Sequence, residues 1–315
     1  MQKILTISLN PALDYAVEVD EVLPDLKLRC VNPTLEPGGG GVNVSRAVAL
    51  LGGESTAFVA LGGATGNIMA ELLCEAGIDV ARFDGPGMTR QSTAVIETTT
   101  EKQYRFGQPG PEWSDEYAER ALQDIDTRLE AGMWVVASGS LPPGVAQDFY
   151  VRLGQLVVTA GAKMIVDTSG AAQKAVLAQG VGLMHVLRMD QHESVHLAGH
   201  PLTTREEAAR FAQTIASKES AALVIVARGA DGSVFATPDR CFHWVSPKGK
   251  VVSKVGAGDS FVGGLVLGLA QGMSFEEAGR LATAAASAAV TTPVSALCPR
   301  PIVDKLLPDT LFSAL

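Results

Sequence analysis

Aromatic residues and cysteines are scarce in this chain of 315 residues. Only 5% of the side chains are aromatic, and the chain has four cysteines: Cys30, Cys74, Cys241 and Cys298. They lie far apart and form no C-x-x-C pair, which argues against both a disulfide framework and a thiolate zinc site. We therefore expect reduced, buried thiols.

A basic excess is also missing. The chain has 25 Lys and Arg residues against 34 Asp and Glu residues, a formal net charge of -9. This balance argues against a broad surface for nucleic acid or acidic lipid, so an anionic ligand must meet a local group of cations. No apolar run approaches the ~20 residues that span a bilayer, and the start MQKILTISLN lacks the features of a secretion signal. We expect a soluble, cytoplasmic protein without nucleic-acid or membrane partners.

Glycine and apolar residues are abundant, with 33 glycines and 47% hydrophobic side chains. Short β-rich runs alternate with amphipathic stretches, as in residues 3–9 followed by 42–51, and 55–61 followed by 67–75. This alternation predicts an α/β fold with a mostly parallel central sheet between layers of helices. Two capping boxes, Thr203 with Glu206 and Ser274 with Glu277, predict helix starts.

Two segments interrupt the alternation. Residues 12–36 and 88–107 are β-rich without intervening helices, and they predict a small accessory sheet. A lid over a site and an edge hairpin of the main sheet are both compatible with this pattern. No repeat or linker is found, so we expect residues 1–315 to form a single domain that carries this β lid.

Glycine-rich loops precede two predicted helices. Residues 38–41 are four consecutive glycines whose amides suit an anion or sugar oxygens, although a flexible turn is equally compatible. In residues 255–260, Asp259 follows Gly256, Ala257 and Gly258. This carboxylate could accept a hydroxyl proton beside amides that hold a phosphoryl group, or it could simply cap the helix.

A third glycine loop, residues 228–232, follows a predicted strand and could approach a nucleotide or form an ordinary hairpin turn. The chain contains no G-x-x-x-x-G-K-[ST] motif, and its glycine loops do not satisfy G-x-G-x-x-G. A P-loop NTPase and an NAD dehydrogenase are therefore disfavoured.

Five motifs in order resemble the ribokinase-like (PfkB) sugar kinase family along essentially the whole chain. They are LNPALD from residue 9, EPGGGGVNVSRA from 36, LGGATG from 61, SGSLPPG from 138 and GAGDSFVGG from 256. Residues 27–30, 89–91 and 103–106 most resemble the 6-phosphofructokinase branch of that family. Its 1-phosphofructokinases and tagatose-6-phosphate kinases are close relatives that typically carry lysine where this chain has Gly40.

The resemblance implies a ribokinase-like three-layer α/β/α fold and transfer of the γ-phosphoryl group of MgATP to the 1-hydroxyl of fructose 6-phosphate. It implies that the base is Asp259 and that the anion hole is formed by Gly256, Ala257 and Gly258. The implied sugar site comprises Asp14, Gly38, Gly39 and Asn43 for the hydroxyls, with Arg90, Arg105, Ser138, Lys27 and Arg29 for the phosphate. It further implies a homodimer through the lid, in which Lys27 or Arg29 reaches the neighbour's site.

On the nucleotide side, the resemblance points to Arg188, Asp190, Gly229, Gly232 and Lys254, with Glu193 holding Mg²⁺ through water. The chain departs from the family here, because residues 188–193 read RMDQHE instead of K-P-N-x-x-E, and residues 253–255 read SKV instead of D-T-T. Pro293 and Val294 occupy the loop that binds a monovalent cation in relatives, so K⁺ dependence stays open.

Two hypotheses from other classes remain. His192, Glu193 and His196 form an H-E-x-x-H pattern that could bind zinc in a hydrolase, followed by His200 as a poorly spaced third ligand. The second hypothesis is a sensor that binds a sugar phosphate without catalysis. Asp190 and the altered nucleotide loops motivate it.

Overall fold

A large sheet of ten strands forms the centre of the molecule, in the order β14-β13-β12-β11-β10-β9-β8-β1-β4-β5. The structure is a computed structural model that describes residues 1–180, 182–218, 220–292 and 296–315. The parallel strands are β1 (Ile4–Ser8), β4 (Thr56–Leu61), β5 (Asp79–Asp84), β8 (Trp134–Ser138), β9 (Lys163–Asp167), β10 (Met184–Met189) and β11 (Ala221–Ala227). Antiparallel strands β12 (Ser233–Ala236), β13 (Cys241–Val245) and β14 (Leu311–Ala314) extend one edge.

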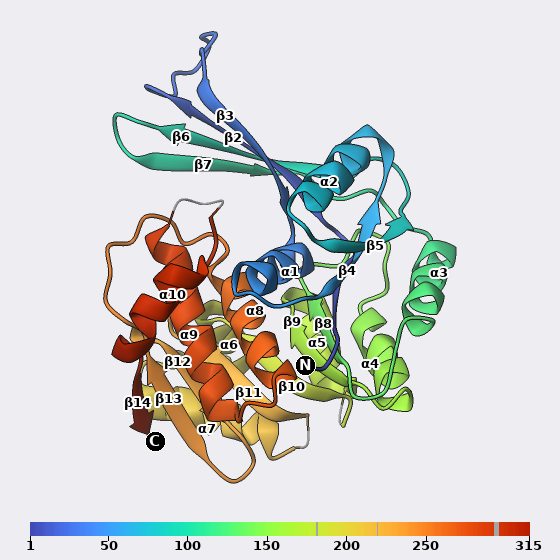
Figure 1. The fold of residues 1–315 in the computed structure, drawn as a ribbon, viewed down its shortest axis with the longest axis vertical. Coiled ribbons are helices and arrows are strands. Elements are labelled where there is room, and N and C mark those ends of the chain that lie inside the picture. The colour runs from blue at the N-terminus through green and yellow to red at the C-terminus, as the bar shows by residue number, and fades with distance from the viewer. Residues whose placement is uncertain (181, 219, 293–295) are drawn as a thin grey trace.

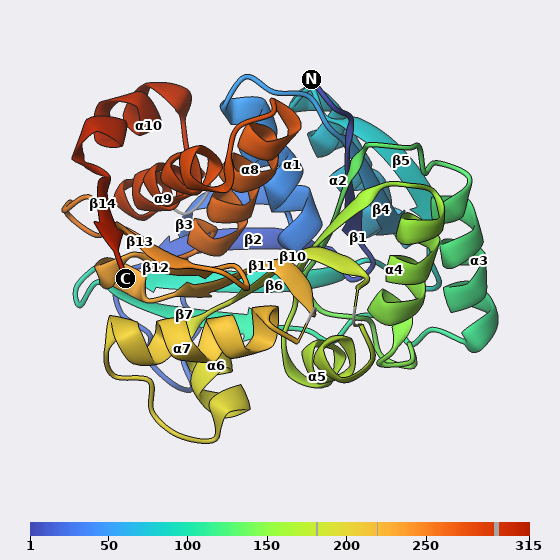
Figure 2. The ribbon, with the colours of Figure 1, turned by 90° about the horizontal axis from the view of Figure 1, so that it is seen from below.

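Helices cover both faces of this sheet, as Figure 2 shows from below. One face carries α3 (Asp115–Asp126), α4 (Phe149–Thr159), α5 (Gly170–Gln179) and α7 (Arg205–Ala216). The other carries α1 (Gly40–Leu50), α2 (Gly63–Glu75), α8 (Ala257–Ala270), α9 (Phe275–Thr291) and α10 (Arg300–Leu306). A short helix, α6 (Gln191–Ala198), follows β10. The predicted three-layer α/β fold is confirmed.

The central strands are apolar on both sides because each side faces a helix layer. Along β8, Val135 and Ala137 belong to one buried cluster, whereas Trp134 and Val136 belong to the cluster on the opposite face. Successive side chains of a strand point to opposite faces, so an uninterrupted apolar run is needed when both faces are covered. This explains the continuous apolar runs in the sequence.

A second, four-stranded sheet stands apart from the main sheet and projects from one end of the molecule (Figure 1). It comprises β3 (Val31–Gly38), β2 (Ala12–Val19), β6 (Arg90–Glu97) and β7 (Lys102–Gly107) in that order. The predicted accessory sheet is therefore confirmed, and these strands do not extend the edge of the large sheet. We call this four-stranded sheet the lid sheet.

One of the two predicted capping boxes is shifted by a residue. Ser274 caps α9 and Glu277 completes the box, as expected. At α7 the box is formed by Thr204 and Glu207, so the pairing of Thr203 with Glu206 was wrong. Thr203 donates its backbone N–H and its hydroxyl to the Glu207 carboxylate instead, which lets the helix begin one residue later.

Helices α1 and α8 pack closely because α8 carries a glycine at their contact. A Cβ atom at Gly263 would lie 2.6 Å from the Cβ of Ala47 and 3.2 Å from the carbonyl oxygen of Val44. Both helices begin at the same edge of the large sheet, where Gly41 approaches the end of β1 and Gly258 approaches Arg188 of β10. Their spacing therefore sets the distance between the two glycine loops.

The helices were also compared with the length and hydropathy of a membrane span. Within the described ranges, no helix combines the length and the hydropathy required to cross a bilayer.

Replacing Gly263 by alanine should lower the free energy of unfolding by about 1–3 kcal/mol, because the added methyl group overpacks the contact with Ala47. Urea unfolding at neutral pH measures the change. Gly107→Ala is the matched control, since a Cβ there meets nothing within 4 Å. Equal stability of the two variants would contradict the close-packing account.

Candidate active site

Asp259 lies in the first turn of α8, at the carboxyl ends of the parallel strands. The helix begins at Gly256, which adopts a left-handed conformation (φ 74°) that favours glycine. No side chain caps this helix, so Asp259 does not act as its cap. Its carboxylate Oδ2 instead accepts a hydrogen bond of 2.9 Å from Nδ2 of Asn43, a residue of α1. The two glycine loops thus meet through this hydrogen bond.

The environment of Asp259 makes its carboxyl a weaker acid than usual. Burial is the largest influence and raises its pKa from 3.8 to about 6. The hydrogen bond from Asn43 and the charge of Arg188 oppose the increase, whereas Asp167 and Asp14 add to it. A carboxylate with a pKa close to neutral can accept a proton effectively under physiological conditions.

Arg188 lies directly beside the second glycine loop. Its guanidinium nitrogens are 3.2 Å from the position of a Cβ at Gly258, so a side chain there would crowd Arg188. Nη1 of Arg188 donates to Oδ1 of Asp167 over 2.9 Å, and both side chains are largely buried. The buried Nε of Arg188 has no hydrogen-bond partner in the described part of the chain.

Asp167 was not among the predicted site residues. It ends β9, and it is the only acid of that strand (KMIVD). A carboxylate that directly follows a buried apolar run, at the edge where ligands bind in parallel sheets, was the available signal. Sequence reasoning recognised the strand and overlooked its last residue.

A cavity of about 570 Å³ opens beside the glycine loop of α8. Six of the predicted nucleotide-site and anion-hole residues line it: Arg188, Gly229, Gly232, Lys254, Ala257 and Gly258. Phe261, Val251 and Val290 supply an apolar wall. Its size is that of a small-molecule pocket, and the start of α8 presents free amides to it, so the residues present fit a nucleoside triphosphate.

Asp190 and Glu193 form a capping box at the start of α6. Oδ1 of Asp190 accepts from the Glu193 N–H, and Oε2 of Glu193 accepts from the Asp190 N–H, both at 2.7 Å. Burial and the neighbouring carboxylates raise the pKa of Glu193. Among the described residues no group of three or more potential ligands is arranged to hold a metal. A divalent metal would therefore have to be held through water and nucleotide oxygens, as Mg²⁺ commonly is.

The zinc hypothesis does not fit this geometry. Glu193 is committed to the capping box, and His192 and His196 are exposed. Helix α6 ends at Gly199 in a left-handed conformation before it reaches His200. The H-E-x-x-H spacing therefore falls on an ordinary surface helix.

Asp14 and Ser138 face the first glycine loop. A Cβ at Gly38 would lie 2.1 Å from Oδ2 of Asp14, and a Cβ at Gly40 would lie 2.5 Å from the Ser138 hydroxyl. That hydroxyl is buried and has no hydrogen-bond partner among the described residues. Any side chain at Gly40 would collide with the end of β8.

Two cations of the lid sheet and one of α1 act on the charge of Asp14. Burial raises its pKa, and the charges of Arg105, Arg90 and Arg46 oppose this increase, in that order. Arg90 is held by two carbonyl oxygens, that of Asn10 at 3.2 Å and that of Gln108 at 3.3 Å. The structure thus brings Arg90 and Arg105 to the predicted sugar site. Gly39, the N-cap residue of α1, lies against Pro11, which directly precedes strand β2 and its Asp14.

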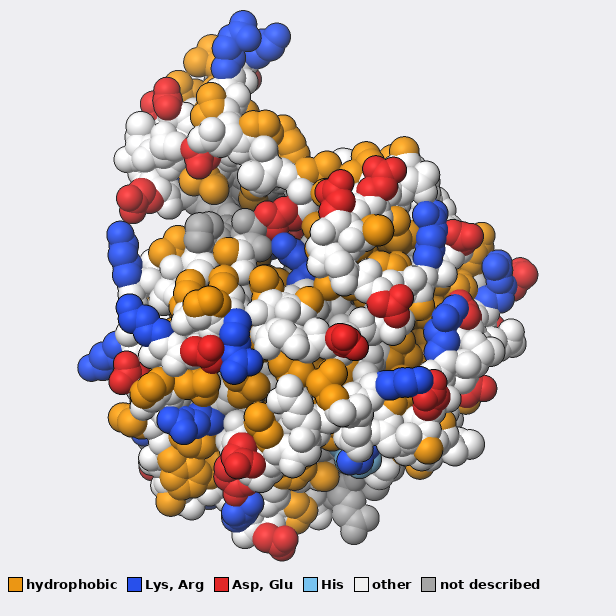
Figure 3. All heavy atoms as spheres, in the orientation of Figure 1, with side chains coloured by type: hydrophobic (Ala, Val, Ile, Leu, Met, Phe, Trp, Pro, Cys, Tyr) orange, Lys and Arg blue, Asp and Glu red, His pale blue; other side chains and the backbone are white. Residues whose placement is uncertain are grey.

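Lys27 and Arg29 lie elsewhere. Both are exposed in the connection between β2 and β3, at the far end of the lid sheet (Figure 1). Figure 3 shows cationic side chains gathered at that tip, away from the body of the molecule. One chain alone does not bring these two residues to Asp259.

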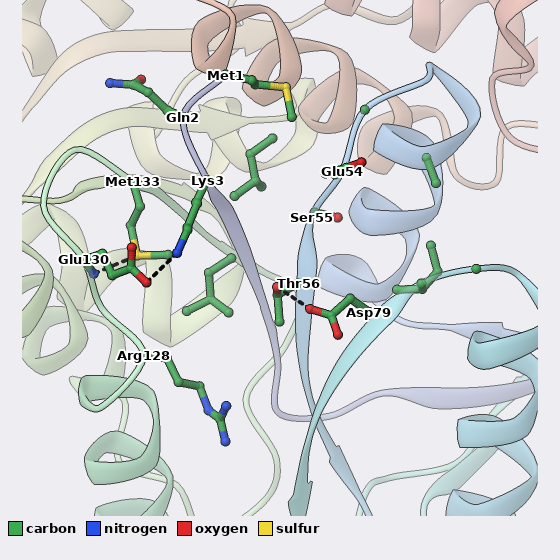
Figure 4. A pocket seen from close by; sticks show the side chains of 16 residues that line it. Met1, Gln2, Lys3, Glu54, Ser55, Thr56, Asp79, Arg128, Glu130 and Met133 are labelled. Atoms are coloured by element: carbon green, nitrogen blue, oxygen red, sulfur yellow. Dashed lines mark hydrogen bonds and ion pairs between the residues drawn. The ribbon is translucent and has the colours of Figure 1, made fainter.

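A larger cavity than the one beside α8, about 860 Å³, lies at the opposite edge of the sheet, where β1, β4 and β5 begin (Figure 4). Lys3 pairs there with Glu130 at 2.7 Å, and the Thr56 hydroxyl donates to Asp79 at 2.6 Å. None of the predicted site residues lines this cavity. Size alone therefore does not identify the active site.

Comparison with known proteins defines the class. The model of the pfkB family carbohydrate kinases matches residues 1–301, so the chain belongs to this family of kinases. Among individual relatives, it is 38% identical over 303 residues to ATP-dependent 6-phosphofructokinase isozyme 2 of Mycobacterium tuberculosis, covering 96% of this chain and 88% of the relative. The isozyme of the same name from Escherichia coli is 38% identical over 307 residues, covering 97% and 98%.

A more distant relative is the 1-phosphofructokinase of Bacillus subtilis, 30% identical over 312 residues, with 99% of this chain and 100% of the relative covered. Phosphofructokinase-2 from Escherichia coli in complex with potassium has a TM-score of 0.93 at 36% identity, covering 98% and 99%. The same enzyme in complex with fructose-6-phosphate has a TM-score of 0.91 at 36% identity over the same shares. The predicted ribokinase-like fold is confirmed by these matches. Pro293 and Val294, on which the question of K⁺ depends, lie outside the described residues.

Asp259→Asn should raise the free energy of unfolding by about 1–2 kcal/mol at pH 8. The folded-state pKa of about 6 exceeds the ordinary 3.8, so stability from this group is lost as pH rises through 6. Asparagine does not ionise, and the gain should therefore be smaller at pH 5. Urea unfolding of both proteins at the two pH values tests this, and a variant less stable than wild type at pH 8 would contradict it.

Proposed function

We propose that this kinase is a 6-phosphofructokinase: it transfers the γ-phosphoryl group of ATP to the 1-hydroxyl of fructose 6-phosphate, giving fructose 1,6-bisphosphate and ADP. The observation that carries the proposal is the placement of Asp259. Its carboxylate lies at the start of α8, between the Arg188 side of the nucleotide cavity and the Asp14 side of the sugar site. Both relatives at 38% identity are 6-phosphofructokinases by name.

The acceptor side is built from polar groups with distinct tasks. Asp14 accepts hydrogen bonds from sugar hydroxyls, and the unpartnered Ser138 hydroxyl donates to the sugar phosphate. Arg90, whose guanidinium is held by two carbonyl oxygens, presents its remaining N–H groups to the same phosphate. Arg105 adds positive charge from β7. These cations offset the acidity of the chain locally.

The transfer step uses few side chains. Asp259 removes the proton of the 1-hydroxyl as the oxygen attacks, while the amides of Gly256, Ala257 and Gly258 donate to the developing charge. Arg188 offsets further negative charge from the nucleotide side. MgATP would supply the phosphoryl group, and Glu193 would hold the metal ion through water.

Gly40 favours this acceptor over the alternatives, 1-phosphofructokinase and tagatose-6-phosphate kinase. Those relatives typically carry a lysine there, for which the approach of Ser138 leaves no space. The 1-phosphofructokinase relative is also less similar, at 30% identity.

A homodimer through the lid sheet completes the proposal. The lid sheet exposes apolar side chains that are unusual on a free surface, including Val31 at 56% and Phe106 at 59% exposure. Pairing of two lid sheets would cover these side chains. It would also bring Lys27 and Arg29, which lie far from their own site, towards the phosphate site of the neighbour.

A panel of acceptors tests the function: fructose 6-phosphate, fructose 1-phosphate, tagatose 6-phosphate and free fructose, each with MgATP. Release of ADP should give the highest kcat/KM for fructose 6-phosphate. A preference for another acceptor would overturn the assignment. Binding of fructose 6-phosphate without any ADP release would identify a sensor instead.

Asp259→Asn should reduce kcat by ~10²-fold or more, the scale of a positioned general base, while the Kd for fructose 6-phosphate stays close to wild type. Turnover assays and calorimetric titration measure the two quantities. Asp239→Asn, an exposed acid in a hairpin turn, is the control and should leave both unchanged. Near-normal turnover of the Asp259 variant would refute its role.

A further inference from the structure

A continuous series of polar contacts connects the lid sheet to Asp259. Oε2 of Glu36, in β3, pairs with Nη2 of Arg46 at 3.1 Å. Nη1 of Arg46 donates to Oδ1 of Asn43 at 3.3 Å, and Nδ2 of Asn43 donates to Oδ2 of Asp259 at 2.9 Å. Asn43 and Arg46 are three residues apart in α1, so they share one face of the helix.

The chemistry of these groups allows one orientation of the Asn43 amide. Arginine only donates hydrogen bonds, and an ionised carboxylate only accepts them. An asparagine between the two must therefore turn its oxygen towards Arg46 and its NH₂ group towards Asp259. The flipped amide would place an oxygen against the carboxylate and an NH₂ group against the guanidinium.

Burial raises the free-energy cost of losing this orientation. Asn43 is 9% exposed, and the Arg46 and Glu36 side chains are 16% and 26% exposed. Water has little access to replace a lost partner, so an unsatisfied polar atom is costly here. Arg46 is itself fixed, because the carbonyl oxygen of Pro37 accepts a further hydrogen bond of 3.0 Å from it.

We propose that Arg46 is a positioning residue for phosphoryl transfer: it holds the Asn43 amide in the orientation that donates to Asp259, and Glu36 joins this arrangement to the lid sheet. This inference rests on the proposed function, in which Asp259 is the general base. It also gives Asn43 a second task, because its NH₂ group is bonded to the base in addition to the sugar contact expected from the sequence.

Loss of this orientation has a measurable consequence. The donor from Asn43 favours the ionised form of Asp259 and works against burial. The other charged groups that face Asp259 are Asp167 from β9, Arg188 from β10 and Asp14 from β2. A change at Arg46 leaves all three in place. When the amide is free to rotate, the carboxyl should become harder to ionise, and turnover should require a higher pH.

The test is the pH dependence of kcat with both substrates saturating, for wild type, Arg46→Gln and Arg46→Lys. Both variants should move the lower kinetic pKa upwards by about 0.5–1 pH unit, the effect of weakening the hydrogen bond to Asp259 when the amide is free to rotate. Turnover should fall several-fold near pH 6 and approach wild type at pH 8.5. Lysine keeps the charge but cannot contact Glu36, Pro37 and Asn43 together.

Arg82→Gln is the matched control. Arg82 also bridges a carboxylate and an asparagine, since Nε donates to Asp84 at 2.8 Å and Nη1 donates to Oδ1 of Asn67 at 3.0 Å, but this group is exposed and outside the site. Its profile should match wild type. Thermal unfolding of every variant verifies folding, and Arg46→Lys decides the test if the glutamine variant is unfolded.

The outcomes separate the two proposals. A shift in Arg46→Gln alone would show a direct effect of charge and overturn the positioning role, as would the absence of any shift. Complete loss of turnover in folded Arg46→Lys would also overturn it, because it would show that Arg46 contacts the reactants. Failure of the proposed function is recognised independently, since wild-type protein would then show no turnover of fructose 6-phosphate.

Discussion

Burial of one ionisable carboxyl group is the constraint around which this molecule is organised. The carboxyl group of Asp259 is shielded from water, and shielding raises the free energy of its charged form. Two groups favour the charged form nevertheless: Asn43 donates a hydrogen bond to the carboxylate, and the positive charge of Arg188 lies nearby. Each comes from a different part of the chain.

Placement of positive charge follows from the same constraint. The chain has a net charge of -9, yet both of its expected ligands are anions. Arg188 is paired with Asp167, and Arg90 is held by carbonyl oxygens, so these guanidinium groups are oriented before a ligand arrives. Groups held in this way lose less conformational entropy on binding than free surface cations.

Much of the site could be predicted from local patterns. The loop around Asp259 was recognisable because glycines, an acid and an apolar helix follow one another within a few residues. Asp167 was overlooked because a single acid at a strand end has no distinctive neighbours in sequence. The same holds for the contact between Asn43 and Asp259, which are separated by 216 positions. Lys27 and Arg29 show the converse. The resemblance to the family predicts them for the sugar-phosphate site, but in the structure they lie at the tip of the lid sheet, away from the site of their own chain.

The fold class, the accessory sheet and the two glycine loops could be recognised in the sequence, because these features depend on periodicity and on the conformations open to glycine. The hydrogen bond from Asn43 to Asp259 and the pairing of Arg188 with Asp167 become visible only in the folded molecule. These outcomes depend on how closely α1 approaches α8, and that approach is set by packing between residues far apart in the chain, such as Ala47 and Gly263.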